Sequence, residues 1–150
     1  MAFLCKAGKG ARNVSDVLFV CVHNAGRSQM AKALFNWLAG ERRLSLRAES
    51  AGTEPGESIH QNVLDAMKEL GLDLSKERPR LMTNAMVEQA RRVITMGCAV
   101  DSDACPAIFL RDVEDWGLPD PKGRSLEEVR AIRETIRQRV EALIESLLPA

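Results

Sequence analysis

The sequence has no tyrosine, and its 150 residues include only two tryptophans and four phenylalanines. Aromatic side chains are the usual walls of a deep slot for an aromatic ring, so a site of that kind has little material here. The chain also has no net charge, because 21 basic side chains balance 21 acidic ones. We therefore expect neither nucleic acid nor a membrane surface as a partner. A small ligand suits this composition better.

Long apolar runs are missing too, and no stretch approaches the length of a membrane span. The opening MAFLCKAGKGAR is mildly basic, but its apolar run is short and no small-residue cleavage site follows, unlike a secretory signal. Residues 1–13 show no periodicity. We predict a flexible N-terminal extension there and one catalytic domain at 14–150. We expect a soluble, cytoplasmic monomer.

Cysteine is scarce, with Cys5, Cys21, Cys98 and Cys105 as the whole set. A chain of this size without a secretory signal rarely carries a disulfide framework, so catalytic or redox-active thiols are the better interpretation. The cysteines form no Cys-x-x-Cys pair, and only two histidines could complete a metal site. We expect no bound metal and no cofactor. Cys5 lies in the predicted extension and is given no role.

Short apolar segments alternate with amphipathic ones along the rest of the chain. Strands are predicted at 17–21, 46–51, 92–96 and 108–110, and helices at 28–39, 59–70, 83–90 and 126–147. This order predicts a Rossmann-like α/β fold with three layers, αβα, around a four-stranded parallel sheet. We expect Gly40 and Gly71 to end the first two helices and Thr83 and Ser125 to cap the last two, with Glu128 completing a capping box.

Parallel sheets of this kind bind ligands at the carboxyl ends of their strands. Cys21 ends the first predicted strand, and Cys98 follows the third. The turn after Cys21 leads directly into a helix, so its N–H groups and the helix dipole form an anion cradle. In such surroundings the pKa of a cysteine falls by about 1 to 4, which makes Cys21 a thiolate at neutral pH.

The other residues of this turn suit the same chemistry. Arg27 offers two donors to a tetrahedral oxyanion, and Ser28 can donate a hydrogen bond to the sulfur. Asn24 and Gly26 tolerate the backbone angles that a tight loop needs. The alternative is an inert buried cysteine beside a solvated arginine. The turn lacks the glycine and GK[ST] spacing of a nucleotide-binding Walker sequence.

The stretch VCVHNAGRSQMA at 20–31 resembles the low-molecular-weight protein tyrosine phosphatases and the arsenate reductases that share their fold. The resemblance continues through ESAGT at 49–53, SIHQNVLDAMKELGLDLS at 58–75 and WGLPDPKG at 116–123. It implies that Cys21 is the nucleophile and that the loop residues bind the oxyanion, namely Val22, His23, Asn24, Ala25, Gly26, Arg27 and Ser28. Asp120, followed by Pro121, matches the family's general acid, although Asp-Pro alone more often marks a turn.

Two branches of this family share the loop. Cys98 and Cys105 resemble the second and third cysteines of thioredoxin-coupled arsenate reductases, which implies that Cys98 attacks Cys21, arsenite leaves, and a Cys98–Cys105 disulfide passes to thioredoxin. The alternative is that both cysteines are small apolar fillers. We therefore expect an arsenate reductase for arsenic detoxification, with electrons from thioredoxin and weak phosphatase activity at most. Other reductases of this fold use a low-molecular-weight thiol with a glutaredoxin-like partner.

The main alternative is a low-molecular-weight protein tyrosine phosphatase, which hydrolyses phosphomonoesters through a phosphocysteine. That branch has tyrosine after its Asp-Pro, where this chain has Lys122. A non-catalytic oxyanion-binding or redox-sensing protein is a further alternative, while a phosphocysteine carrier would leave Asp120 without a role. Some reductases of the family hold potassium through a carboxylate eleven residues after the nucleophile. Lys32 stands there, so we expect no such site.

Overall fold

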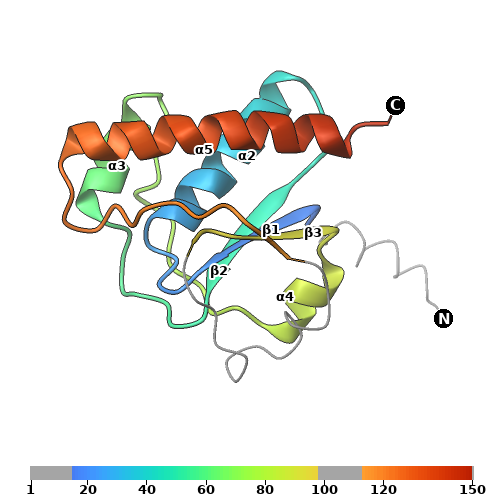
Figure 1. The fold of residues 1–150 in the computed structure, drawn as a ribbon, viewed down its shortest axis with the longest axis horizontal. Helices are drawn as coiled ribbons and strands as arrows, with labels where there is room; N and C mark the ends of the chain where they lie inside the picture. The colour runs from blue at the N-terminus through green and yellow to red at the C-terminus, as the bar shows by residue number, and fades with distance from the viewer. Residues whose placement is uncertain (1–14, 98–112, 150) are drawn as a thin grey trace.

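The computed structural model describes residues 15–97 and 113–149. Four parallel strands form one sheet in the order β2-β1-β3-β4. They are β1 (Val17–Cys21), β2 (Ala48–Gly52), β3 (Arg92–Thr95) and β4 (Glu114–Asp115). The helices in the described ranges are α2 (Arg27–Glu41), α3 (Gln61–Lys68), α4 (Asn84–Gln89) and α5 (Leu126–Leu147). The predicted αβα fold with a four-stranded parallel sheet is confirmed (Figure 1).

The central strand β1 is buried on both faces, which explains its continuous apolar sequence. Val17 and Phe19 face the core formed with α2, α3 and α5, whereas Leu18 and Val20 face the smaller core formed with α4. Figure 1 shows α2, α3 and α5 on one side of the sheet and α4 on the other. Burial on both faces fixes the register of β1 against its neighbours. In that register Cys21, the last residue of β1, pairs with Gly52 and lies at the carboxyl edge of the sheet.

Both predicted helix caps at the N-termini are confirmed. The Ser125 hydroxyl accepts a hydrogen bond from the Glu128 amide, and the Glu128 carboxylate accepts one from the Ser125 amide, at 3.2 and 3.0 Å. The Thr83 hydroxyl accepts from the Met86 amide at 3.2 Å. These bonds satisfy amide groups that the first turn of a helix leaves without a partner.

The two glycines predicted to end helices behave differently. Gly71 has φ +79° and follows the last turn of α3, as predicted. Gly40 instead lies inside α2, which continues to Glu41. Arg43 takes the left-handed φ of 57° there, while the Leu44 amide bonds the Ala39 carbonyl at 2.8 Å. The prediction that Gly40 ends the helix was wrong. The last turn is closed where a residue adopts the left-handed conformation, and here that residue is Arg43.

The fourth strand of the sheet was missed in the sequence because β4 is two exposed acidic residues without an apolar run. The Asp115 carboxylate accepts hydrogen bonds from the Thr95 hydroxyl at 2.7 Å and the Gly97 amide at 2.8 Å, so tertiary contacts define this strand. The strand predicted at 108–110 and the extension predicted at 1–13 lie outside the described residues. Within the described ranges, no helix is both long and apolar enough to cross a membrane.

An ion-pair cluster ties the C-terminal end of α3 to α5. Glu69 accepts hydrogen bonds from Arg130 at 3.0 Å and from Arg133 at 2.8 Å, and Arg133 also donates to the Ala66 carbonyl at 2.8 Å. The hydrogen bonds from Arg130 and Arg133 lower the pKa of Glu69 from 4.5 to about 2. The ionised carboxylate is therefore the form that the folded state stabilises.

Replacing Glu69 should change how stability depends on pH. Because its folded pKa is below its unfolded one, its stabilising contribution is complete above pH 4.5 and is lost as the pH falls toward about 2. We expect Glu69→Gln to lower the Tm at neutral pH and to make the decline of Tm below pH 4.5 shallower than in wild type. Thermal denaturation across this pH range measures both effects. Glu141→Gln, which breaks an exposed pair at 3.8 Å, is the control and should leave the slope unchanged.

Candidate active site

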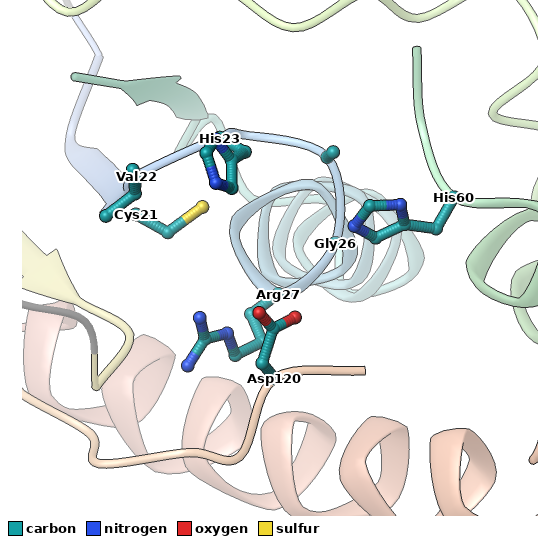
Figure 2. A pocket seen from close by; sticks show the side chains of 8 residues that line it. Cys21, Val22, His23, Gly26, Arg27, His60 and Asp120 are labelled. Carbon is teal, nitrogen blue, oxygen red and sulfur yellow. The ribbon is translucent and has the colours of Figure 1, made fainter. Parts of the chain in front are cut away.

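A cavity opens at the carboxyl end of β1, where the chain turns into α2. Its lining comes from three separate stretches of the chain and consists of Cys21, Val22, His23, Ala25, Gly26, Arg27, His60 and Asp120. Figure 2 shows the Cys21 sulfur and the Arg27 guanidinium on the concave side of the loop, with Asp120 and His60 across from the nucleophile. The sequence predicted this edge of the sheet as the site, and the structure brings Cys21, Arg27 and Asp120 together there.

The loop is held from outside through its carbonyl groups. The amides of Thr53, Glu54, Gly56 and His60 donate to the carbonyls of residues 21, 22, 23 and 25, at 3.3, 2.8, 2.9 and 3.0 Å. Because these carbonyls are engaged by the 53–60 segment, the loop keeps backbone N–H groups for its concave side. The segment after β2 therefore shapes the cradle that the sequence predicted.

Gly52 allows this close contact between the loop and the end of β2. A Cβ atom at this position would lie 2.5 Å from the Val22 carbonyl oxygen and 3.0 Å from the Asn24 amide nitrogen. No side chain fits there without moving backbone. The glycine in ESAGT thus follows from the approach of the two segments.

The Cys21 sulfur lies among hydrogen-bond donors. The Asn24 amide donates to Sγ at 3.2 Å, and the Ser28 hydroxyl lies 2.8 Å from Sγ. The Asn24 side-chain amide donates to the same hydroxyl oxygen at 2.7 Å, which leaves the Ser28 hydrogen for the sulfur. Donors aimed at sulfur stabilise the thiolate relative to the thiol. The expected Ser28 contact is present, and Cys21 is only 4% exposed.

Asn24 organises the back of the loop. It is fully buried, has φ 53°, and its Oδ1 accepts hydrogen bonds from the Arg80 amide at 2.9 Å and from Gln29 at 3.0 Å. Asn24 and Ser28 therefore support the cavity from behind, whereas the other predicted oxyanion-binding residues line it. Sequence reasoning missed Arg80 because its contact comes from 56 positions away and involves backbone.

Arg27 is the first residue of α2, and its guanidinium is fixed by two backbone carbonyls. Nη1 donates to the Met96 carbonyl at 2.9 Å and to the Leu118 carbonyl at 2.6 Å. Nε and Nη2 make no hydrogen bond within residues 15–97 and 113–149 and remain as donors. The two anchors come from the segments after β3 and β4, so this arginine is oriented by three parts of the fold.

Asp120 lies at the opening of the cavity, in an exposed turn. Its Oδ1 accepts a hydrogen bond from the Lys122 amide at 3.0 Å, and its carbonyl accepts one from Arg124 at 2.7 Å. The turn that Asp-Pro commonly marks is present, and it directs the carboxylate toward the loop (Figure 2). Asp120 can therefore belong to the predicted turn and also be the predicted general acid.

Sequence reasoning missed His60, which precedes α3 and lines the cavity beside Asp120. Burial lowers the pKa of His60 from its usual 6.5, while the Asp120 charge opposes this effect and Lys122 and His23 reinforce it. The imidazole is therefore mainly neutral at neutral pH. A single histidine after an apolar residue gave no signal, because its place in the cavity depends on how α3 packs against the loop.

Two further predictions concern residues around the loop. Cys98 and Cys105 lie outside the described residues, so their positions stay predictions. Lys32 forms ion pairs with Glu77 at 3.1 Å and Glu49 at 3.4 Å. Within the described ranges, no group of three or more histidine, cysteine or acidic side chains could hold a metal.

The family model of low molecular weight phosphotyrosine protein phosphatases matches residues 16–149. The chain therefore belongs to this family, and the resemblance drawn from the loop and the Asp-Pro segment is confirmed.

Within the family, the chain is similar to proteins named as arsenate reductases. It is 41% identical to a putative arsenate reductase of Halobacterium salinarum, over 87% of this chain and 92% of the relative. It is 33% identical to a glutaredoxin arsenate reductase of Synechocystis, over 87% of this chain and 97% of the relative. The solved thioredoxin-dependent arsenate reductase of Corynebacterium glutamicum superposes with a TM-score of 0.71 at 35% identity, covering 94% of this chain and 70% of that one.

Removing the Ser28 hydroxyl should make Cys21 a weaker nucleophile. A hydrogen bond to a charged group contributes about 1.5 to 3 kcal/mol, so we expect Ser28→Ala to slow alkylation of Cys21 by iodoacetamide about tenfold or more at mildly acidic pH. Mass spectrometry of the Cys21 peptide measures this rate. Ser146→Ala, whose hydroxyl donates to the Leu143 carbonyl in α5, is the control. An unchanged rate in Ser28→Ala would contradict its role as donor to the sulfur.

Proposed function

We propose that this protein is an arsenate reductase that uses Cys21 as nucleophile and is recycled by thioredoxin. The observation that carries the proposal is the convergence of Cys21, Arg27 and Asp120 on one cavity. The names of the relatives from Halobacterium, Synechocystis and Corynebacterium support arsenate as the substrate. We propose that the enzyme is a cytoplasmic monomer without a bound cofactor and without nucleic-acid or membrane partners.

In the first step, the Cys21 thiolate attacks the arsenic atom of arsenate. Arg27 and the N–H groups of the loop hold the remaining oxygens, where negative charge increases. Asp120 gives a proton to the departing oxygen, which leaves as water while the sulfur–arsenic bond forms.

In the second step, the Cys98 thiolate attacks the sulfur of Cys21. A disulfide forms as the sulfur–arsenic bond breaks, the electron pair goes to arsenic, and arsenite leaves. Cys105 then attacks Cys98, which releases Cys21 as thiolate and forms a Cys98–Cys105 disulfide. The dithiol of thioredoxin reduces this disulfide and is itself oxidised.

The contact between Arg27 and the chain after β3 supports this relay. The Met96 carbonyl lies 2.9 Å from Arg27 Nη1, and Cys98 follows Met96 by two positions. The described chain after β3 therefore reaches Arg27, which lines the cavity, two positions before Cys98. A third cysteine favours thioredoxin over a glutaredoxin system, because it closes the disulfide within this chain.

A phosphatase is the second candidate, since the family takes its name from that reaction and the same cavity could hold a phosphate ester. Water would then hydrolyse the phosphocysteine, and Cys98 and Cys105 would be dispensable. The absence of tyrosine, with Lys122 after the Asp-Pro pair, favours the reductase because no aromatic wall is available there.

The relay predicts which thiols are essential. In an assay that couples arsenate reduction to NADPH through thioredoxin and its reductase, we expect wild type and Cys5→Ser to turn over continuously. Cys98→Ser and Cys105→Ser should stop after at most one turnover, because the oxidised nucleophile or intermediate is not recycled. NADPH absorbance measures both results.

Other outcomes identify the alternatives. If Cys98→Ser and Cys105→Ser match wild type, the relay is wrong. If thioredoxin fails while glutaredoxin with glutathione supports turnover, the substrate proposal stands and the reductant does not. If arsenate causes no NADPH oxidation and an aryl phosphate is hydrolysed rapidly, the protein is a phosphatase.

A further inference from the structure

The side-chain amide of Asn62 joins the first turn of α3 to the turn that carries Asp120. Its Nδ2 donates to the Pro121 carbonyl at 2.8 Å and to the Arg124 carbonyl at 3.0 Å. Its Oδ1 is buried and accepts no hydrogen bond from the described part of the chain. The amide is thus used for its two donors alone, although a buried oxygen without a donor is unfavourable.

The other hydrogen bonds of the 120–124 turn are local. Asp120 accepts from Lys122 and Arg124, the Arg124 amide donates to the Pro121 carbonyl at 3.0 Å, and Arg124 pairs with Glu128 at the start of α5. Within residues 15–97 and 113–149, Asn62 supplies the hydrogen bonds that connect this turn to a distant segment. Without Asn62, the turn keeps its local hydrogen bonds but loses those that connect it to α3.

The same turn of α3 also contacts the nucleophile loop. The His60 amide donates to the Ala25 carbonyl at 3.0 Å. Pro121 packs so closely on the loop that a Cβ atom at Gly26 would lie 2.8 Å from its Cγ. Residues 60–62 therefore hold the loop with one hydrogen bond and the acid-bearing turn with two, which sets the spacing between Cys21 and Asp120.

We propose that Asn62 is a positioning residue that holds Asp120 where it can protonate the leaving group. The inference rests on the proposed function, in which Asp120 is the general acid. Asn62 touches neither the cavity nor the nucleophile, so it acts through the Pro121 and Arg124 carbonyls. Small displacements of a proton donor strongly reduce its contribution, because proton transfer requires hydrogen-bond distance.

The test uses aryl phosphates, because their leaving groups can be varied while the nucleophile and cradle stay the same. Phenyl phosphate needs a general acid more than p-nitrophenyl phosphate, whose phenolate leaves readily. We expect Asn62→Leu to lower kcat/KM for phenyl phosphate about tenfold or more and to change that for p-nitrophenyl phosphate little. The inhibition constant of inorganic phosphate should stay as in wild type, because Cys21 and Arg27 are unaffected.

Two further variants separate positioning from folding. Asn62→Asp keeps the shape of the side chain but removes its donors, and it should show the same dependence on the leaving group. Asn36→Leu removes another structural amide, which bonds both backbone groups of Ala48 at 3.1 and 2.9 Å, far from Asp120 in the fold. It should leave the ratio of the two substrates unchanged, whatever it does to stability.

A double-mutant cycle with Asp120→Asn completes the test. If Asn62 acts through Asp120, adding Asn62→Leu to Asp120→Asn should cause no further loss, with aryl phosphates and with arsenate alike. Additive losses, or an unchanged substrate ratio in both Asn62 variants, would overturn the inference. If the wild type hydrolyses aryl phosphates but does not reduce arsenate, the reductase proposal fails, and the substrate ratio still decides the role of Asn62.

Discussion

The cavity depends on the hydrogen bonds between the 53–60 segment and the carbonyls of the nucleophile loop. Four amides of this segment engage carbonyls of residues 21–25, and Gly52 lets the two stretches approach. A tight turn after a strand has many accessible conformations, and these bonds select one with N–H groups on the concave side. The position of the Cys21 sulfur and the opening toward Asp120 follow from that conformation.

The residues of the site fall into two groups that the sequence does not distinguish. Cys21 and Arg27 line the cavity, whereas Asn24 and Ser28 lie behind it and determine how the sulfur is held. Arg27 in turn is oriented by the carbonyls of Met96 and Leu118. The residues that line the cavity therefore rely on buried hydrogen bonds behind the loop. These bonds are strong because they are shielded from water.

The site could largely be predicted because its chemistry is concentrated in one short stretch. A buried strand ending in Cys21, followed by a turn with Asn24 and Gly26 and then by Arg27, already implies an anion cradle at a sheet edge. Asp120 could be named only through the family resemblance, since Asp-Pro by itself indicates a turn. His60 and Asn62 could not be found, because their importance comes from the packing of α3 against segments 35 or more positions away.

The sequence by itself determined the αβα class, the central strand and the nucleophile loop, because hydrophobic periodicity and cap residues act over a few neighbouring positions. Only the tertiary structure decided that Gly40 continues α2, that the acidic pair Glu114–Asp115 forms β4, and that α3 holds the Asp120 turn. The last two depend on hydrogen bonds between residues far apart in the chain, whereas the last turn of α2 is closed by Arg43 and Leu44 nearby. Local sequence does not encode such contacts, since the partners meet only after the helices pack on the sheet.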